Sequence, residues 1–168
     1  GPTLSFKDFG MSFMARLIAF LIKGDNQELH VLAATSGDTG SAVGHGFLKV
    51  PGVRVWILYP KGQVSHIQEQ QLTTMGHNVT AIEVEGSFDD CQALVKKAFS
   101  DPGLNAKRRL TSANSINIGR LIPQIFYYFF GYAQLHKPGH EAVFSVPSGN
   151  FGNLTAGLLA KKMGLPIK

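Results

Sequence analysis

The stretch Leu-His-Val-Leu-Ala-Ala-Thr-Ser-Gly-Asp-Thr-Gly, residues 29–40, decides the fold class. Its first six residues form a short apolar run that is typical of a buried strand, and its last six are small, polar and rich in glycine. Helical spacing of apolar residues follows directly, over 41–49. Strand, glycine turn and helix in this order indicate an α/β protein with a mainly parallel sheet.

The same alternation extends along the chain on both sides of this stretch, which predicts a three-layer αβα fold. Residues 111–117 are polar and are expected to be irregular. The predicted strands cover 29–34, 53–59, 79–84 and 142–146, and the predicted helices cover 8–23, 41–49, 67–75, 88–99, 121–135 and 154–163.

Composition limits the classes of protein to which the chain can belong. Its 168 residues are 44% hydrophobic and 16% charged, which is enough for a sizeable core and excludes a disordered tail. The only cysteine, Cys91, cannot form an internal disulfide, so we expect a buried packing thiol and a reducing, cytoplasmic compartment.

The charge and hydropathy patterns give no sign of a nucleic-acid or membrane partner, and the mildly positive charge, which is typical of solvated loops and helix ends, would also suit a phosphorylated substrate. The net charge of +5 is spread out and forms no dense basic stripe. The longest apolar candidate for a membrane span, 11–22, is short and interrupted by Arg16. The pair His136 and His140 is separated by Pro138-Gly139, so we expect no metal site.

The run Ser-Gly-Asn-Phe-Gly-Asn at 148–153 follows an apolar segment and precedes a predicted helix. Small residues at a helix start let backbone amides approach a phosphate. No Gly-Lys-Ser/Thr follows, which excludes a mononucleotide P-loop. The alternative is an ordinary strand-to-helix turn.

Lys7 lies between aromatic residues in Ser-Phe-Lys-Asp-Phe, residues 5–9. Leu4, Phe6 and Phe9 could form an apolar wall, and burial against such a wall helps a lysine to react as a neutral amine. The alternative is a surface lysine at a helix start.

Two further polar segments could bind anionic groups. The hydroxyls of Ser36 and Thr39 could hold a carboxylate, although Ser36 or Asp38 could simply be the helix N-cap. The segment 112–120 offers neutral donors and a guanidinium for a phosphate ester, or else a polar loop that caps the next helix.

Taken in order, the segments 6–8, 34–40, 112–117 and 148–153 resemble the signature segments of the threonine synthase family. The resemblance runs over essentially the whole chain. It implies the fold-type II architecture of tryptophan synthase β, pyridoxal 5'-phosphate as cofactor, and conversion of O-phospho-L-homoserine and water to L-threonine and phosphate.

The resemblance also assigns roles to residues. Lys7 would be catalytic, would carry the cofactor and would move protons. At Asp38 the chain departs from the family pattern, because many relatives have asparagine at this position. The implied cofactor-binding residues are Lys7, Ser36, Gly37, Asp38, Thr39, Gly149, Asn150, Phe151, Gly152 and Asn153, and the implied substrate-binding residues are Ser36, Thr39, Asn114, Ser115 and Arg120.

By the same resemblance, 1–28 and 121–168 would belong to the larger cofactor domain and 29–120 would form a smaller mobile lobe. Complete relatives continue beyond both ends, so we expect a central fragment with little or no activity by itself, and the oligomeric state stays open. The alternatives are another fold-type II lyase, such as a serine/threonine dehydratase, and a cofactor-free module that binds phosphoanions.

Overall fold

A computed structural model of the chain describes residues 1–135 and 141–168. Its contacts form two compact units, 1–116 and 117–168, and each is described by itself. His136 and His140, the pair considered for a metal site, lie outside the described residues. No helix in the described ranges has the length and apolar character needed to cross a membrane.

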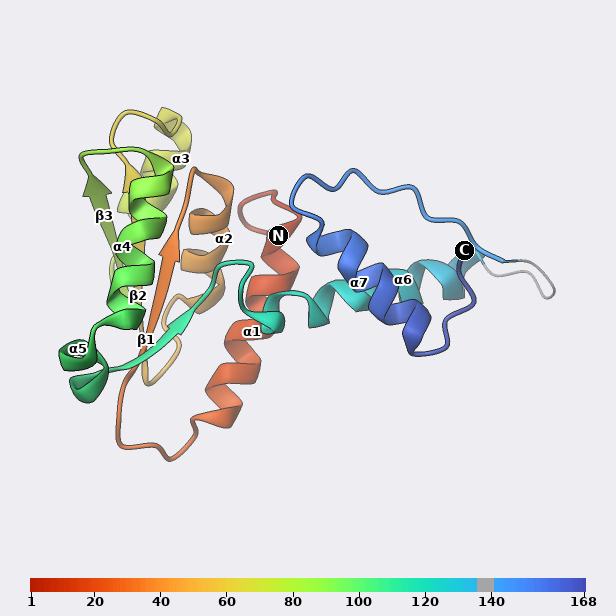
Figure 1. The fold of residues 1–168 in the computed structure, drawn as a ribbon, viewed down its shortest axis with the longest axis horizontal. Helices are drawn as coiled ribbons and strands as arrows, with labels where there is room; N and C mark the ends of the chain where they lie inside the picture. Colours follow the sequence, from red (N-terminus) through yellow and green to blue (C-terminus); the bar gives the residue numbers. More distant parts are fainter. Residues whose placement is uncertain (136–140) are drawn as a thin grey trace. The chain divides into compact units, whose positions relative to one another are not determined.

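The first unit is built on a four-stranded sheet in the order β3-β2-β1-β4, and every neighbouring pair is parallel (Figure 1). Three of these strands confirm the sequence prediction, but β4 falls partly in the segment expected to be irregular. Among the described residues, this edge strand pairs with β1 alone, so it needs no continuous apolar run. The strands are β1 Leu29–Ala34, β2 Val53–Pro60, β3 Val79–Val84 and β4 Arg109–Ser112.

Helices cover both faces of this sheet (Figure 1). Because successive strand residues point to opposite faces, Val31 and Ala33 join the core beneath α1, α2 and α3, whereas Leu32 and Ala34 join the core beneath α4. Cys91 lies in the latter core and is fully buried, as predicted, and burial raises the pKa of its thiol. The helices are α1 Lys7–Leu21, α2 Asp38–Phe47, α3 His66–Thr73, α4 Phe88–Ser100 and α5 Pro102–Lys107.

The short helix α5 was not predicted, although its start carries a recognisable signal. The side chain of Asp101 accepts a hydrogen bond from the Leu104 amide at 2.9 Å, and Pro102 occupies the first helical turn. An acidic N-cap followed by proline is a common way to begin a helix.

The second unit contains the 3-10 turn η1 Ile118–Arg120 and the helices α6 Ile122–Leu135 and α7 Gly152–Lys162. The two helices pack through a small core that includes Ile125, Tyr128 and Ala156. The strand predicted over 142–146 is wrong: only Ala142 pairs, through a single parallel bridge to Ile167. Without a longer partner segment, the apolar residues that follow Ala142 form no ladder.

The close approach of α1 and α2 yields a stability prediction. A Cβ atom on Gly46 would lie 2.9 Å from the carbonyl carbon of Met11, and this is backbone that cannot rotate away. Gly46→Ala should therefore lower the free energy of unfolding by about 1–3 kcal/mol. Lys97→Ala, on the exposed face of α4, should stay within about 0.5 kcal/mol of the parent. Urea unfolding of the full-length protein measures both, and equal values would contradict the packing argument.

Candidate active site

Lys7 is the first residue of α1, and its amine faces a carboxylate instead of an apolar wall. Its Nζ lies 4.0 Å from Oδ2 of Asp38, and about a third of the side chain, 34%, is exposed. The proposed wall does not enclose it, because Leu4 is 93% exposed and Phe6 is 53% exposed. Leu4 adopts a left-handed backbone conformation, with φ of 56°, and its side chain reaches solvent.

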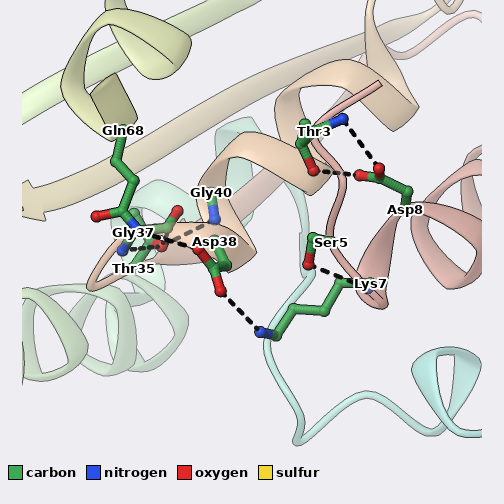
Figure 2. Close-up of polar contacts among 9 residues, drawn as sticks. All are labelled: Thr3, Ser5, Lys7, Asp8, Thr35, Gly37, Asp38, Gly40 and Gln68. Carbon is green, nitrogen blue, oxygen red and sulfur yellow. Dashed lines mark hydrogen bonds and ion pairs between the residues drawn. The ribbon is translucent and has the colours of Figure 1, made fainter. Parts of the chain in front are cut away.

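The segment before Lys7 is held by Asp8, which is buried. Its carboxylate accepts hydrogen bonds from the backbone amide of Thr3, at 2.9 Å, and from the Thr3 hydroxyl (Figure 2). Burial alone would raise the pKa of Asp8, but the Thr3 hydrogen bonds, together with the N-terminal charge and the Ser5 backbone, outweigh it and hold that pKa below its ordinary value. The backbone amide of Lys7 donates to Ser5 Oγ at 3.2 Å, so hydrogen bonds also fix the backbone at the lysine itself.

The turn after β1 is organised by the hydroxyl of Thr35, which is buried (Figure 2). Thr35 Oγ1 accepts from the amides of Gly37, at 3.0 Å, and Gly40, at 2.8 Å, and donates to the Gly37 carbonyl. The N-cap residue of α2 is Gly37, without a side-chain cap, so the predicted caps Ser36 and Asp38 are wrong. Thr35 supplies from within the turn the oxygen that a cap side chain would otherwise provide.

This arrangement leaves the polar side chains of the turn available for other contacts. Ser36 is exposed and Thr39 is half-buried. Asp38 is 61% exposed, and its Oδ1 accepts a hydrogen bond from Gln68 Nε2 at 2.8 Å. The carboxylate of Asp38 therefore bridges an amide on one side and the Lys7 amine on the other (Figure 2).

Asn114 behaves as an extra residue of the sheet. Its Oδ1 accepts from the Ala34 amide at 3.0 Å and its Nδ2 donates to the Ala34 carbonyl at 2.8 Å, so the side chain pairs with β1 as a peptide group would. This contact was not predicted; the nearest signal is that Asn114 lies two residues after the end of β4. Ser115 is exposed. The phosphate-binding role expected for the two residues stays a prediction.

In the second unit, the predicted phosphate loop leads directly into α7. Phe151 is the N-cap residue, with φ of 56°, and the hydrogen bond from the Thr155 amide to the Phe151 carbonyl closes the first helical turn at 2.8 Å. The amides of Gly152, Asn153 and Leu154 precede this bond, so they are the donors that a helix leaves open at its start. At Gly149 an added Cβ would meet no atom of the described residues within 4 Å, so nothing there crowds this position of the loop.

Tyr128 on α6 supports the start of α7, a contact that was not predicted and that no local sequence signal indicates. Its hydroxyl donates to the Asn153 carbonyl at 2.8 Å and also contacts Asn153 Oδ1. A Cβ on Gly157 would lie 2.7 Å from the Tyr128 ring, so glycine makes room for the phenol. Burial raises the pKa of the Tyr128 hydroxyl, a direction that favours its protonated, donating form.

Arg120, in η1, is buried, with 9% of its surface exposed. Among the described residues its Nε has no hydrogen-bond partner, and burial lowers the pKa of its guanidinium. A buried cationic donor that lacks a partner favours an anionic ligand.

These groups fit pyridoxal phosphate by their chemistry. Lys7 offers an amine of the kind that reacts with an aldehyde, and the start of α7 offers open amides of the kind that bind a phosphate. Within the described ranges, no group of three or more histidine, cysteine, aspartate or glutamate side chains could hold a metal ion.

Comparisons with known proteins agree with this chemistry. The model of the family described as pyridoxal-phosphate dependent enzyme matches residues 1–167. Threonine synthases of Buchnera aphidicola subsp. Baizongia pistaciae and Escherichia coli K12 are 58% and 55% identical to the chain over its whole length. The chain spans about two fifths, 39%, of the length of each of these relatives.

The chain is also similar to solved structures of threonine synthases. The crystal structure of threonine synthase from Escherichia coli superposes with a TM-score of 0.87 at 55% identity, covering 100% of this chain and 39% of that one. Threonine synthase from Brucella melitensis with bound pyridoxal phosphate superposes with a TM-score of 0.90 at 43% identity, covering 99% and 36%. The α/β fold with a parallel sheet, the Lys7 segment and the glycine loop all lie within the matched region, and the chain belongs to the family of pyridoxal-phosphate dependent enzymes.

Proposed function

We propose that the protein containing this chain converts O-phospho-L-homoserine and water into L-threonine and phosphate, as a cytoplasmic enzyme of threonine biosynthesis. The observation that carries this proposal is the 55–58% identity to threonine synthases along the whole chain. Because the chain spans 39% of those relatives, we propose that it has little or no turnover by itself.

Lys7 is the proposed catalytic residue. Bound pyridoxal phosphate would supply an electron sink for the negative charge that develops at the substrate's Cα. Lys7 would bond the cofactor through Nζ and, once the substrate's amine has displaced it, would take the Cα proton. Asp38, 4.0 Å from Nζ, would stabilise the ammonium that results.

The proposed binding roles go to groups whose hydrogen-bonding capacity is available to a ligand. The amides at the start of α7, in 149–153, would hold the cofactor phosphate, with Tyr128 fixing Asn153. Ser36 and Thr39 would bind the substrate carboxylate, and Arg120 would bind the substrate phosphate with Ser115. Asn114 would fix the end of β1, since both ends of its side-chain amide bond Ala34.

We also propose that 29–120 acts as the mobile lobe and that 1–28 and 121–168 belong to the cofactor domain. In the structure α1 packs with the sheet, within the unit 1–116. The proposed lobe boundary at residue 29 concerns which segments move, and α1 can pack against a lobe that moves relative to it.

The first test is removal of the amine. Lys7→Ala in the full-length protein should lower threonine formation by at least about 10²–10⁴-fold, because it removes the base as well as the attachment point. Borohydride reduction after addition of pyridoxal phosphate should label the peptide containing Lys7. Lys23→Ala, an exposed lysine after α1, should retain activity and labelling. A label on another lysine would overturn the assignment, and absence of any label would favour a cofactor-free module that binds phosphoanions.

Arg120 separates this reaction from that of a dehydratase, whose substrate carries no phosphate. Arg120→Ala should lower kcat/KM for phosphohomoserine by about 10- to 100-fold, the value of a hydrogen bond to a charged group, with a much smaller loss in cofactor affinity. Arg16→Ala, an exposed arginine on α1, is the control. Equal losses in substrate use and cofactor affinity, in a protein that is still folded, would count against a substrate-phosphate role.

Tyr128 tests the proposed phosphate cradle. Tyr128→Phe keeps the ring against Gly157 but removes the hydroxyl that bonds Asn153. The affinity for pyridoxal phosphate should fall by about 3- to 10-fold, which is the worth of one neutral hydrogen bond. Titration by absorbance measures the change, and an unchanged affinity would show that the start of α7 does not depend on this contact.

A further inference from the structure

Gln68 on α3 uses both ends of its side-chain amide. Its Oε1 accepts from the backbone amide and the hydroxyl of Ser65, each at 3.1 Å. The bond from the Ser65 amide, with that from the Gln68 backbone amide to Ser65 Oγ at 3.3 Å, forms the capping box of α3. The Nε2 of Gln68 donates to Asp38 Oδ1 at 2.8 Å. One neutral side chain therefore links the start of α3 to the start of α2 (Figure 2).

The backbone of the turn after β1 is shaped to receive this amide. Gly37 has φ of 143°, a conformation that favours glycine. A Cβ on Gly37 would lie 2.4 Å from Gln68 Nε2 and 2.5 Å from Gln68 Cδ. Glycine at this position thus allows Gln68 to lie directly against the turn that carries Asp38.

The consequence falls on Lys7. Because Gln68 occupies Oδ1 of Asp38, it is Oδ2 that faces the Lys7 amine at 4.0 Å. Asp38 is 61% exposed, so its carboxylate could otherwise adopt other rotamers in solvent. We propose that Gln68 is a positioning residue for Lys7 and that it acts by fixing the carboxylate of Asp38. The proposal rests on the proposed function only for the identity of Lys7 as the reactive amine.

The absence of charge on the Gln68 side chain is part of this role. An N–H donor can orient a carboxylate without adding charge, whereas a second carboxylate at the same place would add negative charge near the amine and favour its ammonium form. Gln68→Glu keeps an acceptor for Ser65, so it preserves the capping box while removing the donor to Asp38. Gln68→Met removes both contacts without adding charge.

The experiment measures the reactivity of Lys7 in the full-length, cofactor-free protein. Trace acetylation at fixed pH, followed by peptide mass spectrometry, gives the labelling of Lys7 relative to Lys23. Gln68→Met should raise this ratio by about 1.5- to 5-fold, the range expected for a loosened, solvent-exposed ion pair. Gln68→Glu should lower it below the parent value. Ser65→Ala should leave it unchanged, because the bond from Gln68 to Asp38 remains.

A double-mutant cycle tests the route through Asp38. In an Asp38→Ala background, Gln68→Met should no longer change Lys7 labelling, because the carboxylate through which Gln68 acts on Lys7 is absent. Persistence of the effect in that background would overturn the proposal. So would an effect of Ser65→Ala as large as that of Gln68→Met, since the capping of α3 would then explain both.

The outcome does not depend on turnover. Labelling is measured without cofactor or substrate. A protein that makes no threonine can therefore still show the predicted labelling pattern, and this result would contradict the proposed reaction but not the role of Gln68. Equal Lys7 labelling in all variants, with urea midpoints that show them folded, would contradict the role of Gln68 and leave the proposed reaction untouched.

Discussion

The geometry of the first unit depends on the hydrogen bonds that the buried hydroxyl of Thr35 makes. This hydroxyl ends β1 and starts α2 by accepting from the amides of Gly37 and Gly40. An added Cβ on Gly40 would lie 2.5 Å from the methyl carbon of Thr35, so the turn is closed by packing as well as by hydrogen bonds. Because the cap is internal, Asp38 is free to face Gln68 and Lys7 instead of its own helix.

The two candidate ligand-binding regions are ordered by different means. Around Lys7, hydrogen bonds of short polar side chains fix the chain: Asp8 holds Thr3, and Ser5 holds the Lys7 amide. At the start of α7, a tyrosine from a neighbouring helix fixes the backbone carbonyl of Asn153. The first arrangement uses residues close in sequence, whereas the second uses residues brought together by helix packing.

That difference explains how much could be predicted from the sequence. The apolar runs of β1, β2 and β3 and the helices that follow them are local patterns, and they were located to within a few residues. The candidate residues around Lys7 were also identified from local sequence. The contacts of Gln68 with Asp38, of Asn114 with Ala34 and of Tyr128 with Asn153 join residues far apart in the chain, and no spacing rule predicts them. The segment 142–146 shows the reverse case: in the described part of the chain, this apolar run has one bridge, from Ala142 to Ile167, and no longer partner with which to form a strand.

Asn114 has a consequence for association between molecules. Beyond β4, the outer side of β1 would present the amide and carbonyl of Ala34 as an unpaired peptide group, which is the kind of template that recruits strands from other chains. The side-chain amide of Asn114 satisfies both groups at 3.0 and 2.8 Å. Within the described part of the chain, this end of β1 therefore offers no unpaired peptide group at Ala34 to a strand from another molecule.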